Sequence, residues 1–190
     1  MPRRLFLCII VAIAACGTNS NESIDRVPTI FNEKRNDATL DQKVQPLLNQ
    51  YFMVMDHLQE QDTADLQFYG ASMIQLADSL SQQKLSNDTA TQSNALQGLM
   101  NIQSEMEAIL MESNPNERLL GAEMLSLHWI ELLAGIGYQK QTLYIFSDNE
   151  GRQWMGLNKK SQNPFKNHSG EVIEAVQVLQ EMKSSNLATN

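Results

Sequence analysis

Four stretches with a helical apolar period dominate the middle of this chain of 190 residues. Between Leu40 and about Tyr138, apolar residues recur at spacings of three, four and seven, which place them on one face of a helix. The stretches begin near residues 40, 62, 93 and 114, and polar segments such as 81–92 separate them. Four such faces can be buried only against one another. The pattern therefore predicts a mainly α-helical protein, built as an up-down four-helix bundle.

Three local signals concern the ends and the regularity of these helices. Asn114, Pro115 and Glu117 resemble a capping box, with proline at the first helical position. Asp62 is expected to cap the second helix. Pro46 lies within the first stretch, so either the helix is kinked there or its regular part begins near that residue.

The composition changes after the fourth stretch. Residues 142–146 are β-branched and aromatic, residues 147–151 are typical of a turn, and residues 153–155 can pair back as a second strand. We therefore expect a short β-hairpin, followed by a loop over 159–169 and a last helix over about 170–183. The apolar stripe of that helix would consist of Val172, Val176, Leu179 and Met182.

The first residues resemble a signal sequence. Arg3 and Arg4 precede an apolar run from Leu5 to Ala15, which is shorter than the ~20 residues of a membrane-spanning helix. Residues 13–16, Ile-Ala-Ala-Cys, resemble the lipobox of bacterial lipoproteins. This resemblance implies cleavage before Cys16, attachment of lipid to that cysteine, including a fatty acid such as palmitate, and anchoring in a membrane. The alternative is an ordinary signal peptide with an incidental cysteine.

These signals divide the chain into three parts. Residues 1–15 are predicted to be a lipoprotein signal peptide, residues 16–38 the lipidated cysteine with a flexible tether, and residues 39–185 the helical-bundle domain. In lipoproteins of this kind an aspartate after the cysteine signals retention in the inner membrane, and Gly17 stands there instead. The expected location is therefore the cell envelope, on the periplasmic side of an outer membrane. The formal net charge of −8 argues against nucleic acid as a partner.

Several residues late in the chain follow a recognisable pattern. Gly151 and Trp154 stand three apart, and Asn163-Pro164-Phe165 follows nine residues after the tryptophan. Weaker matches lie earlier, at Tyr51, Leu58, Asp62, Arg118 and Ser126.

With this order of elements, residues 44–176 resemble an uncharacterised family of bacterial envelope domains, a domain of unknown function often found beside heavy-metal or copper efflux adaptors. Members of that family typically carry Cys-Pro-Met before the glycine and a Cys-Gly pair after the Asn-Pro-aromatic motif, and such soft sulfur ligands suit copper or zinc. The resemblance implies a divergent member that kept the scaffold and lost these ligands. The corresponding places hold Leu143, Tyr144, Ile145, Ser169 and Gly170.

Three residues are candidates for a metal site. Met53 and His57, four apart in the first helix, could share a face and bind copper through thioether and imidazole groups, whereas Met55 points away from Met53. His168 lies in the loop that carries ligands in the resembling family. The competing interpretation is that the methionines fill the core and that His168 is an exposed loop residue.

Another group of residues favours a structural role. Gly151, Trp154, Asn163, Pro164 and Phe165 are interpreted as a clasp, in which the indole covers the end of the bundle and its N–H finds a loop carbonyl.

No catalytic residue is predicted. Ser126, His128 and Glu131 contain the groups of a nucleophilic site, but Ser126 and His128 point apart on a helix. Three triplets also resemble a short O-glycosylation signal, and helix capping or turn formation is the alternative for the first and the third. The triplets begin at Asp62, Asp78 and Asp88.

Two functional hypotheses follow. The first is a non-enzymatic envelope lipoprotein, a membrane-tethered helical module that binds a partner protein or a small envelope ligand and needs no cofactor. The second is a periplasmic copper-handling protein that supplies or senses the metal through histidine and methionine ligands.

Overall fold

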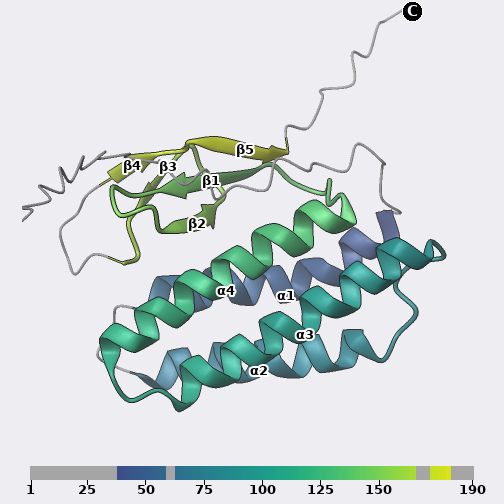
Figure 1. Cartoon of the computed structure of the whole chain (residues 1–190), viewed down its shortest axis with the longest axis horizontal. Helices are drawn as coiled ribbons and strands as arrows, with labels where there is room; N and C mark the ends of the chain where they lie inside the picture. The colour runs from purple at the N-terminus through teal and green to yellow at the C-terminus, as the bar shows by residue number, and fades with distance from the viewer. Residues whose placement is uncertain (1–37, 59–62, 166–171, 181–190) are drawn as a thin grey trace, which may run out of the picture.

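The structure is a computed structural model that describes residues 38–58, 63–165 and 172–180. Within these residues four helices precede five strands, as Figure 1 shows, and the predicted mainly α-helical fold is confirmed. The helices are α1 (Ala38–His57), α2 (Thr63–Ser81), α3 (Thr89–Met111) and α4 (Pro115–Ile136). The strands are β1 (Leu143–Ser147), β2 (Gln153–Gly156), β3 (Lys160–Gln162), β4 (Val172–Glu174) and β5 (Gln177–Gln180).

Some of the predictions lie outside the described residues. They are the signal peptide, Cys16 and the tether before residue 38, the capping by Asp62, and the places of His168, Ser169 and Gly170.

The four helices pack in sequence order, each against the next. In Figure 1, α1 and α4 form the layer nearer the sheet, and α2 and α3 form the other layer. Helix α4 is the one described helix that is long and apolar enough to cross a membrane, and half of that segment is buried in the bundle. The apolar faces of the helices meet in one core, as their period predicts. Large, fully buried side chains of the bundle include Leu47, Tyr51, Met73, Ile102, Met106 and Trp129.

Helix α4 has clear caps at both ends. At its start, the side chain of Asn114 accepts a hydrogen bond from the N–H of Asn116 at 3.0 Å, with Pro115 at the first helical position. The predicted cap is therefore present, although its partner is the second helical residue rather than Glu117 at the third. The helix ends at Gly137, which adopts the left-handed conformation with φ 64°.

Helices α1 and α3 differ in detail from the expected boundaries. Helix α1 continues through Pro46. Helix α3 begins at Thr89 rather than near residue 93, because the carboxylate of Asp88 accepts from both the N–H and the hydroxyl of Thr91, at 2.9 and 2.7 Å.

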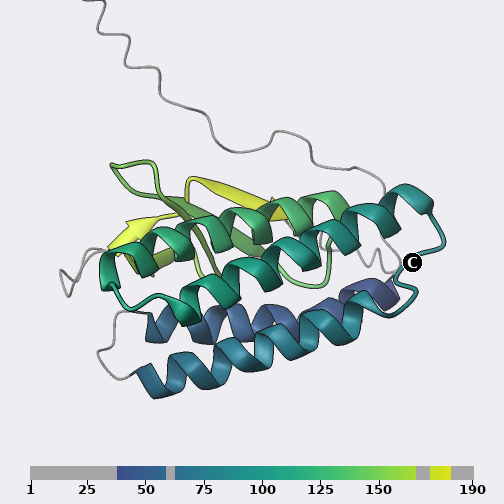
Figure 2. The same cartoon turned by 60° about the horizontal axis from the view of Figure 1, so that its bottom comes forward.

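Strands β1 and β2 form the predicted hairpin. They pair antiparallel, with Phe146 opposite Trp154 and Ile145 opposite Met155. Strand β5 pairs antiparallel with the other edge of β1, so the strand order is β2-β1-β5, and β3 and β4 form a separate antiparallel pair. In Figures 1 and 2 the sheet lies over the α1–α4 layer, on the side away from α2 and α3.

The predicted helix over residues 170–183 is wrong, because residues 172–180 form β4 and β5. Val172 and Val176 were expected to face inward, yet they are 57% and 59% exposed. Val172 lies in β4, whereas Val176 lies at the bend between β4 and β5, so the two side chains do not share a buried helical face. The segment is rich in β-branched residues, and its pairing satisfies the second edge of β1.

Gly98 allows α3 to approach α4 closely. A Cβ at this position would lie 2.8 Å from Leu132 Cδ1 and 3.0 Å from Leu132 Cβ. A Cβ at Gly135, in α4, would instead meet its nearest neighbour, Asn94, at 3.8 Å.

We expect Gly98→Ala to lower the free energy of unfolding by about 1–2 kcal/mol, because the overlap with Leu132 outweighs the gain in helix propensity. The matched control, Gly135→Ala, has room for the methyl group and should raise the free energy of unfolding by up to about 1 kcal/mol. Thermal denaturation followed by circular dichroism measures both changes. Equal effects of the two substitutions would contradict the close approach at Gly98.

Candidate functional site

A buried hydrogen-bond chain joins the sheet to the bundle at Tyr51. This side chain of α1 is fully buried. Its oxygen accepts a hydrogen bond from the N–H of Met155 in β2 at 3.1 Å and lies 2.9 Å from Ser126 Oγ in α4. Because the Ser126 hydroxyl donates to the Ala122 carbonyl at 2.9 Å, the Tyr51 hydroxyl donates to Ser126. The chain therefore runs from β2 through α1 to α4.

The same environment keeps Tyr51 neutral. Burial raises the pKa of Tyr51 to about 12, against the opposing effect of the hydrogen bonds with Ser126 and Met155. The hydroxyl therefore stays protonated around neutral pH and can both donate and accept, as the chain requires.

A second polar contact fixes the start of α1 against the residues that follow α4. The buried carboxylate of Asp41 accepts from the N–H of Gln139 at 3.0 Å. The hydroxyl of Tyr138 donates to Gln45 of α1. Burial and the nearby carboxylate of Asp41 raise the pKa of Tyr138 well above its usual range. Tyr138 and Gln139, which begin the connection from α4 to the sheet, are thus held against α1.

The candidate nucleophilic residues make separate structural contacts. The Ser126 hydroxyl is engaged with Tyr51 and Ala122. The Nδ1 atom of His128 lies 3.6 Å from Glu131 Oε2. Neither contact activates the serine as a nucleophile.

Asp148 organises the turn between β1 and β2. One carboxylate oxygen accepts from the N–H groups of Glu150 and Arg152, at 2.9 and 3.0 Å. The other accepts from the Arg152 guanidinium through Nε at 2.8 Å and Nη2 at 2.6 Å, and from Asn163 Nδ2 at 3.1 Å. Gly151 completes the turn with φ 79°, which a glycine adopts without strain.

The hydrogen bonds of Asp148 lower the pKa of its carboxyl group. Its side chain is almost fully buried, and burial by itself would raise the pKa. Hydrogen bonds from Arg152 and Asn163, together with two backbone N–H groups, outweigh burial and lower the pKa below its usual value. The carboxylate is therefore charged and fully satisfied inside the protein.

An aromatic cluster covers one face of the sheet beside Asp148. Trp154 stacks on Phe146, with 5.4 Å between ring centroids, and meets Phe165 edge to face at 5.8 Å. The Arg152 guanidinium lies 5.3 Å from the centre of the Phe165 ring. The indole N–H donates to the hydroxyl of Ser161 at 3.3 Å.

The structure brings the expected clasp together but places it differently. The side chain of Asn163 accepts from the N–H of Phe165 at 2.9 Å and donates to Asp148. Pro164 lies between Asn163 and Phe165 in the chain. The indole of Trp154 does not cover the end of the bundle. It lies on the face of the sheet opposite to Ile145 and Met155, because successive residues of a strand alternate, and its partner is a hydroxyl rather than a carbonyl.

Asp148 and Arg152 are the members of this site that sequence reasoning missed. An aspartate three residues before a glycine in turn chemistry signals a carboxylate that accepts from backbone N–H groups. Nothing in the local sequence indicates that Asn163, fifteen residues later, supplies a further donor.

Of the described metal candidates, His57 is engaged in contacts between helices. The His57 ring stacks on Tyr69 of α2 at 5.3 Å, and its Nδ1 lies 3.8 Å from Asp65 Oδ2. Met53 is half-buried on α1. Across residues 38–58, 63–165 and 172–180, no three His, Cys, Asp or Glu side chains are grouped to hold a metal ion.

Comparisons with known proteins identify no relative. No family model matches the chain, and neither a curated protein nor a solved structure is similar to it. The resemblance to the envelope family therefore stays a prediction.

We expect Tyr51→Phe to lower the free energy of unfolding by about 1–3 kcal/mol, because the N–H of Met155 loses its acceptor inside the protein. The matched control is Tyr144→Phe in β1, a half-buried tyrosine, for which a change below about 0.5 kcal/mol is expected. Urea denaturation measures both variants. If Tyr51→Phe is as stable as the native chain, the junction does not depend on this hydroxyl.

We expect Asp148→Asn to lower the free energy of unfolding by about 3 kcal/mol, because Arg152 loses its buried counter-charge. The exposed carboxylate of Glu150 also faces Arg152, at 3.4 Å, so Glu150→Gln is the control and should cost less than about 1 kcal/mol.

The same variant should alter the acid limb of the stability profile. The carboxyl of Asp148 is more acidic in the folded than in the unfolded chain, so its contribution is present above the ordinary pKa of 3.8 and is lost as pH falls through the lower folded value. Between pH ~5 and pH ~2, Asp148→Asn should therefore lose less stability than the native chain. Parallel curves in urea denaturation over this range would contradict the lowered pKa.

Proposed function

We propose that the protein is a non-enzymatic lipoprotein of a bacterial envelope, held at the membrane by lipid on Cys16. The observation that carries this proposal is the N-terminal pattern, in which two arginines precede an eleven-residue apolar run that ends in Ile-Ala-Ala before Cys16. The proposed location is the outer membrane, with the helical domain facing the periplasm. There the domain binds a partner protein or a small envelope ligand.

The contacts of the polar side chains support a binding role over an enzymatic one. Ser126 and Tyr51 are used to join α1, α4 and β2. Asp148 and Arg152 are used to close the hairpin turn. A catalytic acid, base or nucleophile needs a side chain that is free to reach a substrate, and these groups are committed to internal bonds.

The packing of α4 supports an N-terminal anchor. Its apolar segment could cross a membrane by length and composition, but half of it is buried against the other helices. Insertion of α4 would therefore break the bundle core, whereas lipid on Cys16 leaves the described fold intact.

Copper handling is the alternative function, and it receives less support from the described residues. His57 is packed between Tyr69 and Asp65. The places of the family's Cys-Pro-Met ligands are occupied by Leu143, Tyr144 and Ile145 of β1, which lie within or against the apolar core. We therefore propose a binding module without a resident metal.

We expect Cys16→Ala to move the protein from the membrane fraction to the soluble fraction, because the lipid has no thiol to be attached to. The chain offers a matched control in Cys8→Ala, which changes the only other cysteine and lies in the proposed signal peptide. That variant should fractionate like the native chain. Cell fractionation with mass spectrometry of the mature N-terminus measures both, and unchanged partitioning of Cys16→Ala would refute the anchor.

A further inference from the structure

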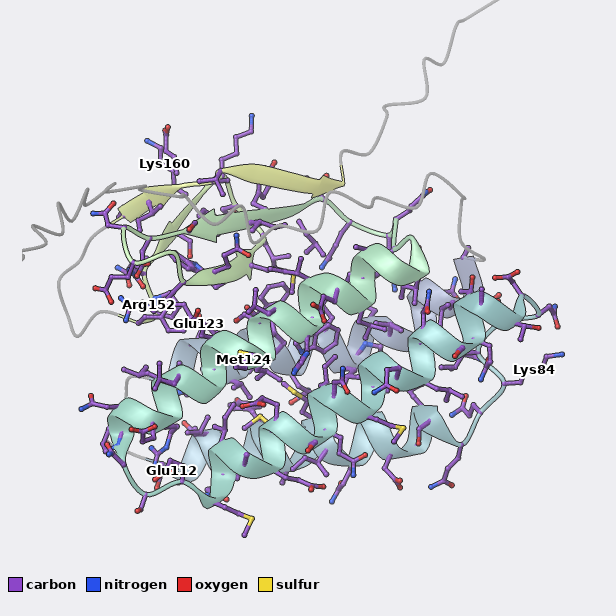
Figure 3. The ribbon with its side chains drawn as sticks, in the orientation of Figure 1. Lys84, Glu112, Glu123, Met124, Arg152 and Lys160 are labelled. Carbon is purple, nitrogen blue, oxygen red and sulfur yellow. The ribbon has the colours of Figure 1, made fainter. Side chains whose placement is uncertain are left out.

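The layer formed by α2 and α3 has an unusual charge distribution. Neither helix contains a lysine or an arginine. Three acidic residues, Asp65, Asp78 and Glu107, are exposed on them. Figure 3 places Lys84 and Glu112 at opposite ends of the bundle, and Arg152 and Lys160 on the side of the sheet. The lysines and arginines of the described residues are Lys43, Lys84, Arg118, Lys140, Arg152, Lys159 and Lys160.

The same layer exposes three large apolar side chains. Phe68 of α2 is 68% exposed, and Met100 and Met111 of α3 are 60% and 87% exposed. The two methionines are eleven residues apart, about three helical turns, so they lie on one side of α3. The amide of Gln67, next to Phe68, donates to the carbonyl of Leu110, next to Met111, at 3.1 Å. We call the surface of Phe68, Met100 and Met111 the α2–α3 face.

Within residues 38–58, 63–165 and 172–180, no strand lies over this face. The sheet covers the opposite layer of the bundle, formed by α1 and α4, as Figures 1 and 2 show. Phe68 and Met111 adjoin the Gln67–Leu110 contact, and Met100 lies about 16 Å farther along the same side of α3. Exposed aromatic and methionine side chains are common at interaction surfaces, and methionine adapts to the shape of what it contacts.

Charge selects among the possible occupants. Two copies joined through this face would bring acidic residues together with no lysine or arginine from α2 or α3 to compensate them. A bilayer with anionic lipids would be repelled for the same reason. A basic protein segment would gain both apolar contact and opposite charge.

We propose that the α2–α3 face binds a basic amphipathic segment of a partner protein, with apolar residues on one side and lysine or arginine flanking them. This inference names the partner chemistry for the proposed binding module. The location of the partner in the envelope rests on that proposed function. The chemistry of the partner rests on the exposed residues of α2 and α3.

The test is a titration of the full chain in phosphatidylcholine nanodiscs with a labelled peptide of leucine and lysine arranged in a helical period. Empty nanodiscs provide the blank, and a leucine and glutamate peptide of the same period is the matched probe. The lysine peptide should bind at least about tenfold more tightly than the glutamate peptide, and added salt should reduce this preference.

Two pairs of substitutions locate the binding. The double substitution Phe68→Gln and Met111→Gln should lower the affinity for the lysine peptide by at least about tenfold, because the apolar anchors are lost. Val172→Gln with Val176→Gln changes two side chains of similar exposure on the sheet and should leave the affinity unchanged. All four positions are exposed, so circular dichroism should report an intact fold in both variants.

Four results would overturn the proposal. They are equal binding of the two peptides, an unchanged affinity in the Phe68 and Met111 variant, dimerisation of the chain that this variant abolishes, and binding of anionic phosphatidylglycerol vesicles that it abolishes. The Cys16→Ala experiment tests the anchor separately. If that experiment fails, the same titration is run on the chain in buffer, so failure of the anchor and failure of the face remain distinguishable.

Discussion

The attachment of the sheet to the bundle depends on the buried hydroxyl of Tyr51. Strand β2 pairs with β1 along one edge, and its other edge carries backbone groups that need partners. Tyr51 accepts from the N–H of Met155 and donates to Ser126, so α1 and α4 together provide a partner for one backbone group of that edge. One hydroxyl thus satisfies a buried N–H of β2 and joins the sheet to two helices.

Asp148 holds the rest of the sheet region by a different kind of chemistry. Its buried charge is balanced by Arg152 and by N–H donors from two segments of the chain. A buried carboxylate with all its donors in place restricts the geometry of the loop. If one donor moves away, the buried charge loses a hydrogen bond that water cannot replace, and the folded state is destabilised. The aromatic cluster of Phe146, Trp154 and Phe165 then packs beside it. Polar and apolar contacts therefore fix the same loop.

The helices were predictable because their information is local. Periodic apolar residues and the cap at Asn114 lie within a few residues of the structure they specify. The strands of the C-terminal segment were not, because they are specified by pairing with residues far away in the sequence, β4 with β3 and β5 with β1. Gly151, Trp154 and Asn163 were identified as a clasp, but the role of Asp148 depends on a donor from a distant loop. The predictions of a signal peptide and of lipid on Cys16 depend on the sequence alone.

The order of elements along the chain has a consequence for folding. All four helices precede the strands, and each helix packs against its neighbour in sequence. Such local contacts form quickly, whereas the bond from Met155 to Tyr51 joins residues 104 positions apart. We expect the bundle to assemble first, with the hydroxyl of Tyr51 still hydrated, and the sheet to displace that water in a later step. Strand β5, the last of the described strands, would then be added to a sheet that already lies on its helices.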